Sequence, residues 1–282
     1  MACLDKANSN NFLVWNKVSG ALTLSQLQSG GLPIACDNTN PIETYDHKYL
    51  TDHQYTIYAN NDTLDTNVSF NYWRVDLVHA DSFVQVVNDV MTLTKDIISG
   101  TDYRWYSTFT FPVVDNNCYR FVIIDTADSN TVLYISNEIE SVDSSEGLML
   151  CKFRNGVNIQ NYNYEGLPSF YNIFHVELDK RKPLSQKNTG GYDKADGSFF
   201  RVRTVRTKTY EFVTGWFDEN EHDATDIMLI HSSLQLGIDG NYTVYNSGED
   251  GGYEPPWQDN YQLIQVAFRL EQENESSSNR AL

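Results

Sequence analysis

The chain has 282 residues and a formal net charge of −18, from 38 acidic and 20 basic side chains. That length is enough for two domains of ordinary size, and the negative charge disfavours DNA, RNA and anionic membranes as partners. Aromatic residues make up 13% of the chain, which, with abundant Asn, Asp, Ser and Thr, favours β-sandwiches with polar loops over helical bundles.

Residues 1–44 are predicted to form an N-terminal arm. Leu22, Leu24 and Leu27 give a short apolar periodicity, and the segment SGGLPIACDNTNP that follows is typical of a loop. The arm could pack on its own domain or on a neighbouring molecule. The start of the chain contains no apolar core of a secretory signal, and no run approaches the length of a membrane span, so we expect no membrane partner.

Residues 45–147 are predicted to form an antiparallel β-sandwich of Ig-like size, because short strand-like runs alternate with turn residues. The runs are YTIYANN, FNYWRVDLVHA, FVQVVND, RWYSTFTF, CYRFVIID and TVLYISNEIE. Alternation of apolar and polar residues is clearest in 119–124 and 132–135. These two stretches predict a hairpin across residues 126–130.

A second β-rich domain is predicted over residues 148–271, after a boundary at 143–168 that contains several Gly and Ser residues and a Pro. The charged segment 179–197 is expected to be a long loop that serves as an interface. It ends in the turn signal Asp196-Gly197.

Strands are expected on either side of residue 205, where the alternation slips and predicts a bulge or tight turn. Residues 264–270 alternate well and predict a last strand with one wet face. Residues 272–282 are expected to be a polar tail.

One short helix is predicted near residues 219–231. Asp218 or Asn220 is a suitable N-cap, and acidic residues in the first turn suit the helix dipole. One buried face is predicted from the spacing of Ala224, Ile227, Met228 and His231. On that face His231 is expected to be a hydrogen-bonded core residue, whereas His222, in the acidic turn, is expected to be exposed.

The sequence contains no catalytic or nucleotide-binding motif, so we predict that the protein is not an enzyme. The histidines are scattered, and the spacing of His47 and His53 does not suit a metal site. Acidic loops do not match the spacing of a calcium loop. We therefore expect no cofactor and no metal. The four cysteines are widely spaced, and we expect reduced thiols.

Two groups of residues are candidates for contacts with partners. The basic run of Arg201, Arg203, Arg206 and Lys208 could bind nucleic acid or form a solvated strand face that meets acidic neighbours. The net negative charge of the chain favours the second interpretation. Tyr253 and Trp257, in the polar segment 247–260, could stack on sugars or anchor a protein interface.

The hairpin CYRFVIIDTADSNTVLYISNEIE resembles a segment of structural proteins of tailed phages that infect Bacteroidetes, in which a Cys-Tyr/Phe-Arg strand precedes a strand ending Tyr-x-Ser-Asn. Further segments also look like virion proteins of crAss-like phages: NYWRVDLVHADS, DYRWYSTFTFP, GYDKADGSFFRVRT and KTYEFVTGWFDENEHDATDIMLIHSS. The likeness spans residues 45–271. It implies a β-sandwich protein in the neck or tail of a virion and brings no catalytic residues with it.

From this resemblance we expect a structural protein that is made in the bacterial host cytoplasm and ends in the virion. It would form a homo-oligomeric ring, sixfold or twelvefold, and contact other neck or tail proteins, with no nucleic acid partner. The N-terminal arm and the segments 179–197 and 247–260 would make the contacts. A carbohydrate-binding or host-attachment module that uses the Tyr/Trp-rich loops is the alternative. A glycan hydrolase is a third possibility, for which no carboxylate pair can be named.

Overall fold

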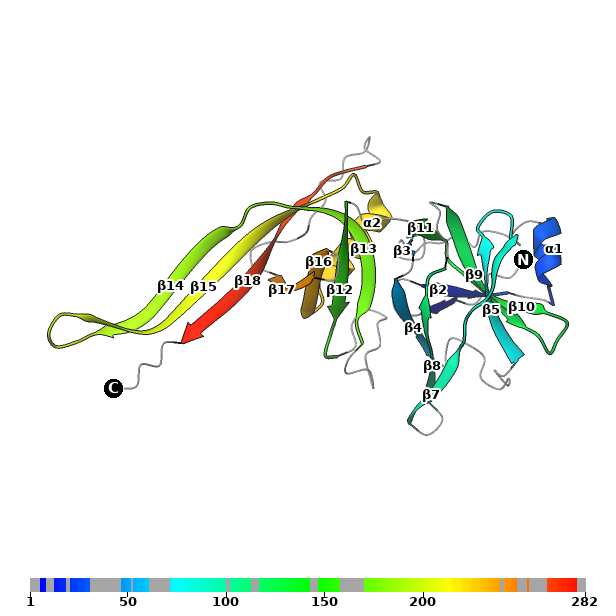
Figure 1. The fold of residues 1–282 in the computed structure, drawn as a ribbon, viewed down its shortest axis with the longest axis horizontal. Helices are drawn as coiled ribbons and strands as arrows, with labels where there is room; N and C mark the ends of the chain where they lie inside the picture. Colours follow the sequence, from blue (N-terminus) through cyan, green and yellow to red (C-terminus); the bar gives the residue numbers. More distant parts are fainter. Residues whose placement is uncertain are drawn as a thin grey trace.

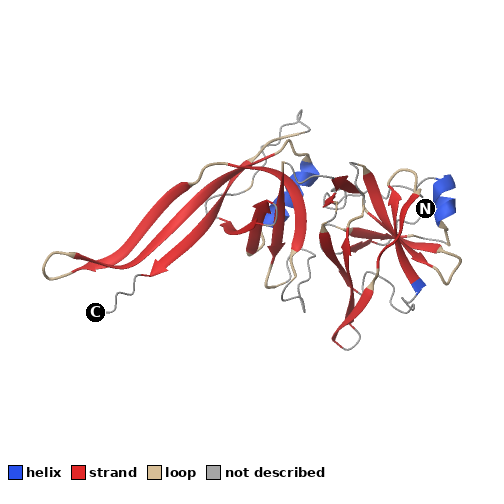
Figure 2. Cartoon of the chain, in the orientation of Figure 1, coloured by secondary structure: helices blue, strands red, loops and turns tan. Residues whose placement is uncertain are grey.

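The computed structural model describes residues 6–8, 13–18, 21–30, 47–51, 53–60, 72–99, 102–112, 117–142, 147–157, 170–238, 241–247, 253 and 263–277. The chain is mostly β, with two short helices among these residues (Figures 1 and 2). The predicted fold class is confirmed at this level. The molecule is elongated, with the N-terminal half at one end and a strand-built arm projecting at the other.

The N-terminal half is a curled mixed sheet, ordered β1-β2-β10-β9-β11-β3, to which β5 and β6 are joined through β9. A separate three-stranded sheet has the order β4-β8-β7. The element bounds are β1 Lys6–Asn8, β2 Val14–Lys17, α1 Leu24–Gly30, β3 His47–Leu50, β4 Gln54–Asn60, β5 Trp73–His79, β6 Gln85–Met91, β7 Thr94–Ser99, β8 Asp102–Thr110, β9 Cys118–Asp125, β10 Thr131–Ser136 and β11 Ile139–Val142.

This half is not clearly the antiparallel Ig-like sandwich that was expected. β3 and β11 pair in parallel, and the main sheet curls into a half-barrel instead of stacking as one of two flat layers. The predicted run TVLYISNEIE also divides into β10 and β11. At the end of β10 the Ser136 hydroxyl, and not a backbone carbonyl, accepts a hydrogen bond from the Phe121 amide at 2.9 Å. The strand runs themselves fall close to where the sequence places them.

The hairpin predicted across residues 126–130 is confirmed. β9 and β10 pair antiparallel on either side of it. Ser129 and Asn130 have φ values of 53° and 59°, and small polar residues tolerate this left-handed region best after glycine.

The described parts of residues 1–44 pack on their own half of the molecule. β2 pairs with β10, and Trp15 and Leu27 are both buried. Of the alternatives for this segment, packing on its own domain is therefore the one observed for these parts.

The C-terminal half is a closed antiparallel barrel of six strands, ordered β13-β12-β16-β17-β18-β15 and closed by pairing between β15 and β13. β14 adds to the outer side of β15. The bounds are β12 Leu148–Arg154, β13 Asn172–Lys180, β14 Leu184–Asp193, β15 Phe199–Thr214, α2 Glu219–Leu229, β16 Ser233–Ile238, β17 Asn241–Ser247 and β18 Ala267–Ser277.

The helix α2 confirms the predicted helix and its cap. The Asp218 carboxylate accepts a hydrogen bond from the Glu221 amide at 2.9 Å, and the Glu221 carboxylate accepts one from the Asp218 amide at 3.2 Å. This reciprocal pair is a capping box. Ala224, Ile227 and Met228 are buried in the barrel core, as the spacing predicts.

The apolar core is divided between the two halves. One cluster gathers barrel residues such as Phe153, Phe174 and Phe212 with the buried face of α2. Two others lie in the N-terminal half, around Phe121 and around Val122. Of the predicted boundary, 143–168, residues 147–157 are described and include β12 of the barrel, whereas the rest lies outside the described ranges. The domain limits stay a prediction.

Candidate functional site

Three strands of the C-terminal half continue beyond the barrel as an arm, made of β14, the outer part of β15 and the end of β18 (Figure 1). β13 pairs with β15 only at residues 212–214, and β17 pairs with β18 only at residues 270 and 271. Residues 199–209 of β15 therefore extend past the closed barrel. At roughly 3.3 Å per residue they reach about 33 Å.

The arm corrects two predictions. Residues 179–197 are not a long loop, because most of them form β14 and its turn, and the expected polar tail begins as strand, since β18 ends at Ser277. Every described side chain from Leu184 to Phe199 is exposed. A strand that is wet on both faces has no need of apolar alternation, which is why the usual signal is absent.

The tip of the arm is the turn that Asp196-Gly197 predicts. Gly197 has a φ of 78°, which a residue without a Cβ adopts freely. The Asp196 carboxylate accepts hydrogen bonds from the Ser198 amide at 2.8 Å and its hydroxyl at 2.6 Å. The Gly197 amide donates to the Lys194 carbonyl at 2.9 Å. The two strands are thus joined by a short, locally hydrogen-bonded turn.

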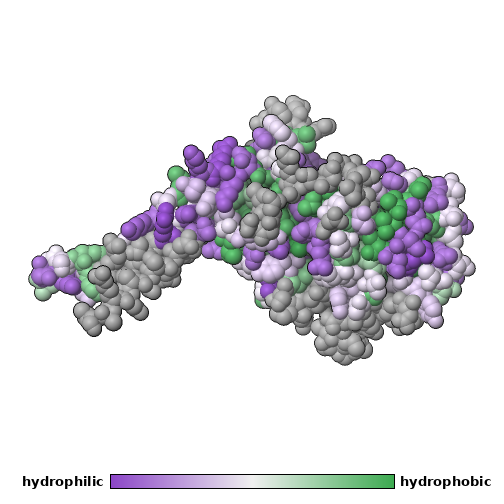
Figure 3. All heavy atoms as spheres, in the orientation of Figure 1, coloured by the Kyte–Doolittle hydropathy of each residue, from purple (hydrophilic) through white to green (hydrophobic). Residues whose placement is uncertain are grey.

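Aromatic rings stand exposed next to this turn. Tyr192 and Phe199 keep 56% and 54% of their surface accessible. Tyr192 contacts Phe200 at a ring distance of 5.3 Å, and the Lys194 ammonium lies 5.0 Å from the Phe200 ring. Figure 3 shows a small hydrophobic patch at this far end of the arm, beyond a largely hydrophilic stretch. Exposed aromatics on a projecting element are typical of protein contacts.

The four predicted basic residues all lie on β15 within the arm. Arg206 is exposed, and its Nε donates to the Ser185 hydroxyl at 3.0 Å; Lys208 is half-buried. The side chains of Arg201 and Arg203 lie outside the described residues. Arg201 pairs with Gly191 and Arg203 pairs with the adjacent Gly190, so β15 has one extra residue, a bulge, between the two arginines. The expected position of the bulge was near Val205.

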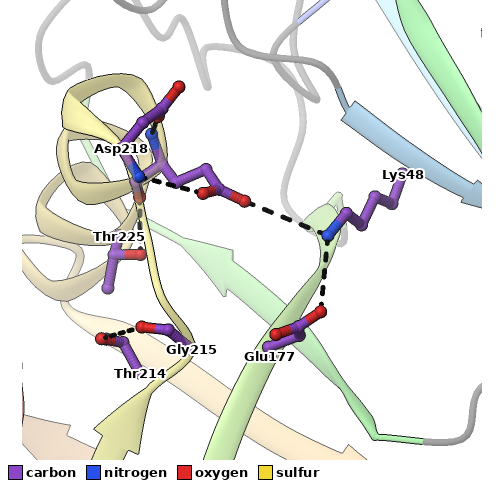
Figure 4. Close-up of polar contacts among 7 residues, drawn as sticks. Lys48, Glu177, Thr214, Gly215, Asp218 and Thr225 are labelled. Carbon is purple, nitrogen blue, oxygen red and sulfur yellow. Dashed lines mark hydrogen bonds and ion pairs between the residues drawn. The ribbon is translucent and has the colours of Figure 1, made fainter. Parts of the chain in front are cut away.

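A polar junction joins the two halves of the molecule. Lys48 of β3 reaches the Glu177 carboxylate of β13 at 3.9 Å and the Glu221 carboxylate at the start of α2 at 4.0 Å (Figure 4). Burial raises the pKa of Glu221, although the Asp218 amide and Lys48 oppose that shift. Ion pairs at such distances contribute little to the free energy of folding by themselves. Their role at the junction is to orient the two halves more than to stabilise their contact.

Histidine and tyrosine side chains form the buried part of this junction. His175 Nδ1 lies 3.2 Å from the Lys48 carbonyl and 3.4 Å from the Tyr55 hydroxyl. The Tyr55 hydroxyl also accepts a hydrogen bond from the Leu50 amide at 2.7 Å. Burial lowers the pKa of His175 to about 4, and nearby His53 adds to this effect. The junction is therefore built around a neutral imidazole.

Tyr253 is half-buried and does not stand free at the tip of a loop. Its hydroxyl is hydrogen-bonded to His222 Nδ1, and its ring meets Phe268 edge-on at 5.6 Å. His222, expected to be exposed, is only 1% exposed, and its Nε2 lies 3.0 Å from the Ile264 carbonyl. Trp257 lies outside the described residues.

His231 is the hydrogen-bonded core histidine that the helical spacing predicts. It is buried, with Nδ1 2.5 Å from the Ile227 carbonyl. Cys118 and Cys151, the two cysteines that the structure describes, carry reduced thiols, as expected. Burial raises the pKa of Cys151, which makes its thiolate scarce.

The described ranges contain no cluster of three or more His, Cys, Asp or Glu side chains placed to bind a metal ion. Within the same ranges no helix is both long and apolar enough to cross a membrane. No family model matches the chain, and a search of curated proteins gives no match. Among the described residues, the arm is the clearest candidate for recognition because it projects from the barrel and carries the exposed rings of Tyr192 and Phe199.

Sequence reasoning found the basic residues and the turn of the arm but missed the arm itself. Its exposed aromatics, Tyr192 and Phe199, were visible in the sequence next to Asp196-Gly197. The available signal was a pair of aromatic residues on either side of a hairpin turn, which is a common cross-strand arrangement.

Proposed function

We propose that this protein is a non-enzymatic structural protein of a tailed-phage virion that forms part of the neck or tail. It assembles as a ring of identical copies and contacts other virion proteins. The resemblance of residues 45–271 to virion proteins of crAss-like phages motivates this proposal. The projecting arm is the single structural observation that carries it.

The arm has the properties of a segment that is completed by a partner. A three-stranded sheet needs an apolar face or a packing element to be stable by itself, yet the described side chains of β14 are exposed on both faces. Among the described strands, none pairs with the outer edge of β14, and proteins normally shorten or cover such an edge. An assembled ring supplies the missing neighbour.

A ring of identical subunits requires that two different surfaces of each copy meet. The arm and the body of the molecule are such different surfaces, since the arm extends away from the barrel (Figure 1). The carbohydrate-binding alternative gains no support from Tyr253, whose ring packs against Phe268 and whose hydroxyl is occupied by His222.

Peptide mass spectrometry on gradient-purified particles from the source culture tests the proposal. We expect peptides of this chain at a fixed ratio to the capsid protein, and that ratio gives the copy number. Peptides that are present in the lysate but absent from purified particles contradict the proposal. A sedimentation profile of the purified protein adds an independent readout of self-assembly.

A further inference from the structure

The register of the arm sorts its charges by face. Lys187 of β14 lies opposite Arg206 of β15, which lies opposite Asn274 of β18. In the next row of the same face, Ser185 lies opposite Lys208. Directly opposed residues in adjacent strands share a face of the sheet. One face of the arm, the basic face, therefore carries Lys187, Arg206 and Lys208.

The alternate positions of β18 belong to the other face. Glu271, Glu273 and Glu275 lie opposite Thr209, Thr207 and Val205 in the register. These three glutamate positions, which we call the acidic face, alternate with Gln272 and Asn274. By register, the basic face holds the positions of three cations. The acidic face holds the positions of three anions and of one cation, Arg203, which follows Val205 on the same face.

The basic face is unfavourable in an isolated molecule. Lys187 and Arg206 are like charges directly opposite each other, an arrangement that destabilises a strand pair. No acidic side chain within the described ranges pairs with the cations of this face. At the base of the arm the pattern differs, because Glu211 pairs with Arg181 at 2.8 Å and with Arg269 at 3.6 Å.

We propose that the basic face of the arm in one copy stacks on the acidic face of the arm in a second copy of this chain. This inference rests on the proposed function and names the surfaces by which identical copies meet. Charge complementarity selects the partner, since a copy brings the same length of twisted sheet and the opposite charge. The contact joins two different faces, so it leaves one face free on each outer copy and continues until a ring closes.

The size of the contact sets how it behaves. Three strands about 4.8 Å apart and about 33 Å long present roughly 450 Å² of sheet. This is below the ~800 Å² per partner of a stable interface, so a single contact is weak. Association is expected to be salt-sensitive and concentration-dependent, and a closed ring is favoured because every copy uses both faces.

Two charge-reversal variants test the pairing. The first is K187E/R206E/K208E, which makes both faces acidic, and the second is E271K/E273K/E275K, which makes both faces basic. Each is examined by sedimentation velocity over a range of concentrations, alone and in an equimolar mixture. The variant K17E/K182E, with two exposed cations changed outside the basic face, is the control for added negative charge.

We expect the original protein and the control to associate, and each triple variant alone to associate at least about tenfold more weakly, because like charges then face each other. The mixture restores association, since each reversed face finds a complementary one on the other variant. The neutral variant K187Q/R206Q/K208Q gives an intermediate result, and circular dichroism confirms that all variants fold.

Several results overturn the inference. The pairing of the two faces is contradicted if either triple variant associates as the original protein does, or if the mixture fails to associate. The proposed ring assembly would still stand in that case. An original protein that remains monomeric at every concentration and salt removes the proposed self-assembly itself. Duplex DNA binding that K187E/R206E/K208E abolishes assigns the basic face to nucleic acid instead.

Discussion

Gly190 and Gly191 are adjacent in β14 but have different surroundings. A Cβ on Gly191 would clash with the backbone carbonyl oxygen of Phe200 and lie 2.6 Å from Cζ of Phe199, whereas a Cβ on Gly190 would meet nothing within 4 Å. We expect Gly191→Ala to displace the aromatic tip and to speed tryptic cleavage at Lys194 severalfold. Gly190→Ala is the matched control and should be cleaved like the original protein. Equal cleavage of both variants would show that the close packing at Gly191 is unimportant.

His175 gives the junction between the halves a predictable response to pH. Its pKa in the folded protein is about 4, against an ordinary value of 6.5. The unfolded chain therefore binds the proton more readily between these values, and stability falls as the pH drops from 6.5 to 4, by about 3 kcal/mol in all. Denaturant unfolding at several pH values measures this slope. His175→Gln should flatten it, and a slope that is unchanged in His175→Gln rules out this origin.

Two histidines of the helical region show what a local pattern can predict at the level of single residues. His231 is buried as the spacing predicts, because it lies two residues beyond the end of α2, where it is hydrogen-bonded to the Ile227 carbonyl of that helix and its ring meets Phe153. His222 follows acidic neighbours and was expected to be exposed, but Tyr253 and the Ile264 carbonyl cover it. These partners lie far along the chain, so no local pattern reveals them.

At the level of elements, α2 is the one most completely specified by its sequence. Its capping box satisfies amides at the helix start that would otherwise lack partners. We expect Asp218→Ala to lower the free energy of unfolding by about 1 kcal/mol, as measured by urea denaturation. Glu219→Ala, in the same turn but outside the box, is the control and should change it less. A similar loss in both variants would assign the effect to charge near the helix dipole and not to the cap.

The strands divide into those that the sequence predicts and those that it does not. β18 was recognised because one face is buried and the other wet. β9 was recognised as an apolar strand too, but it is buried on both faces, since residues 121–124 are all fully buried. β14 is exposed on both faces and gave only a charged, loop-like segment. The break between β10 and β11 falls where the Phe121 amide donates a hydrogen bond to the Ser136 hydroxyl, a contact that a strand-like run does not disclose.

The whole molecule shows where prediction from the sequence reached its limit. The mostly β class follows from composition and from short alternating runs, but the curl of one sheet and the closure of the other depend on pairings between distant strands. β3 pairs with β11, and β15 closes the barrel on β13. Neither pairing leaves a local signal in the sequence. The same alternating pattern is therefore compatible with an Ig-like sandwich and with the observed half-barrel.

The separate apolar cores predict that the two halves unfold as distinct cooperative units. Phe121 lies in a cluster of the N-terminal half and Phe153 in the barrel cluster, and both are fully buried. Replacing either by Ala should cost about 3–5 kcal/mol. The junction consists of the polar groups around Lys48 and His175, with Ile173 of β13 packed on the N-terminal cluster. Because this apolar contact is small, we expect that cost to stay within one half.

Hydrogen exchange measured by peptide mass spectrometry separates the two halves. Phe121→Ala should speed amide exchange in β5 and β9 while β12 and β16 keep their protection, and Phe153→Ala should do the reverse. Each variant is thus the control for the other. Faster exchange throughout the chain in both variants would mean that the junction couples the cores into one unit. In that case the arm would be carried by a single rigid body, and its position relative to the N-terminal half would be fixed before assembly.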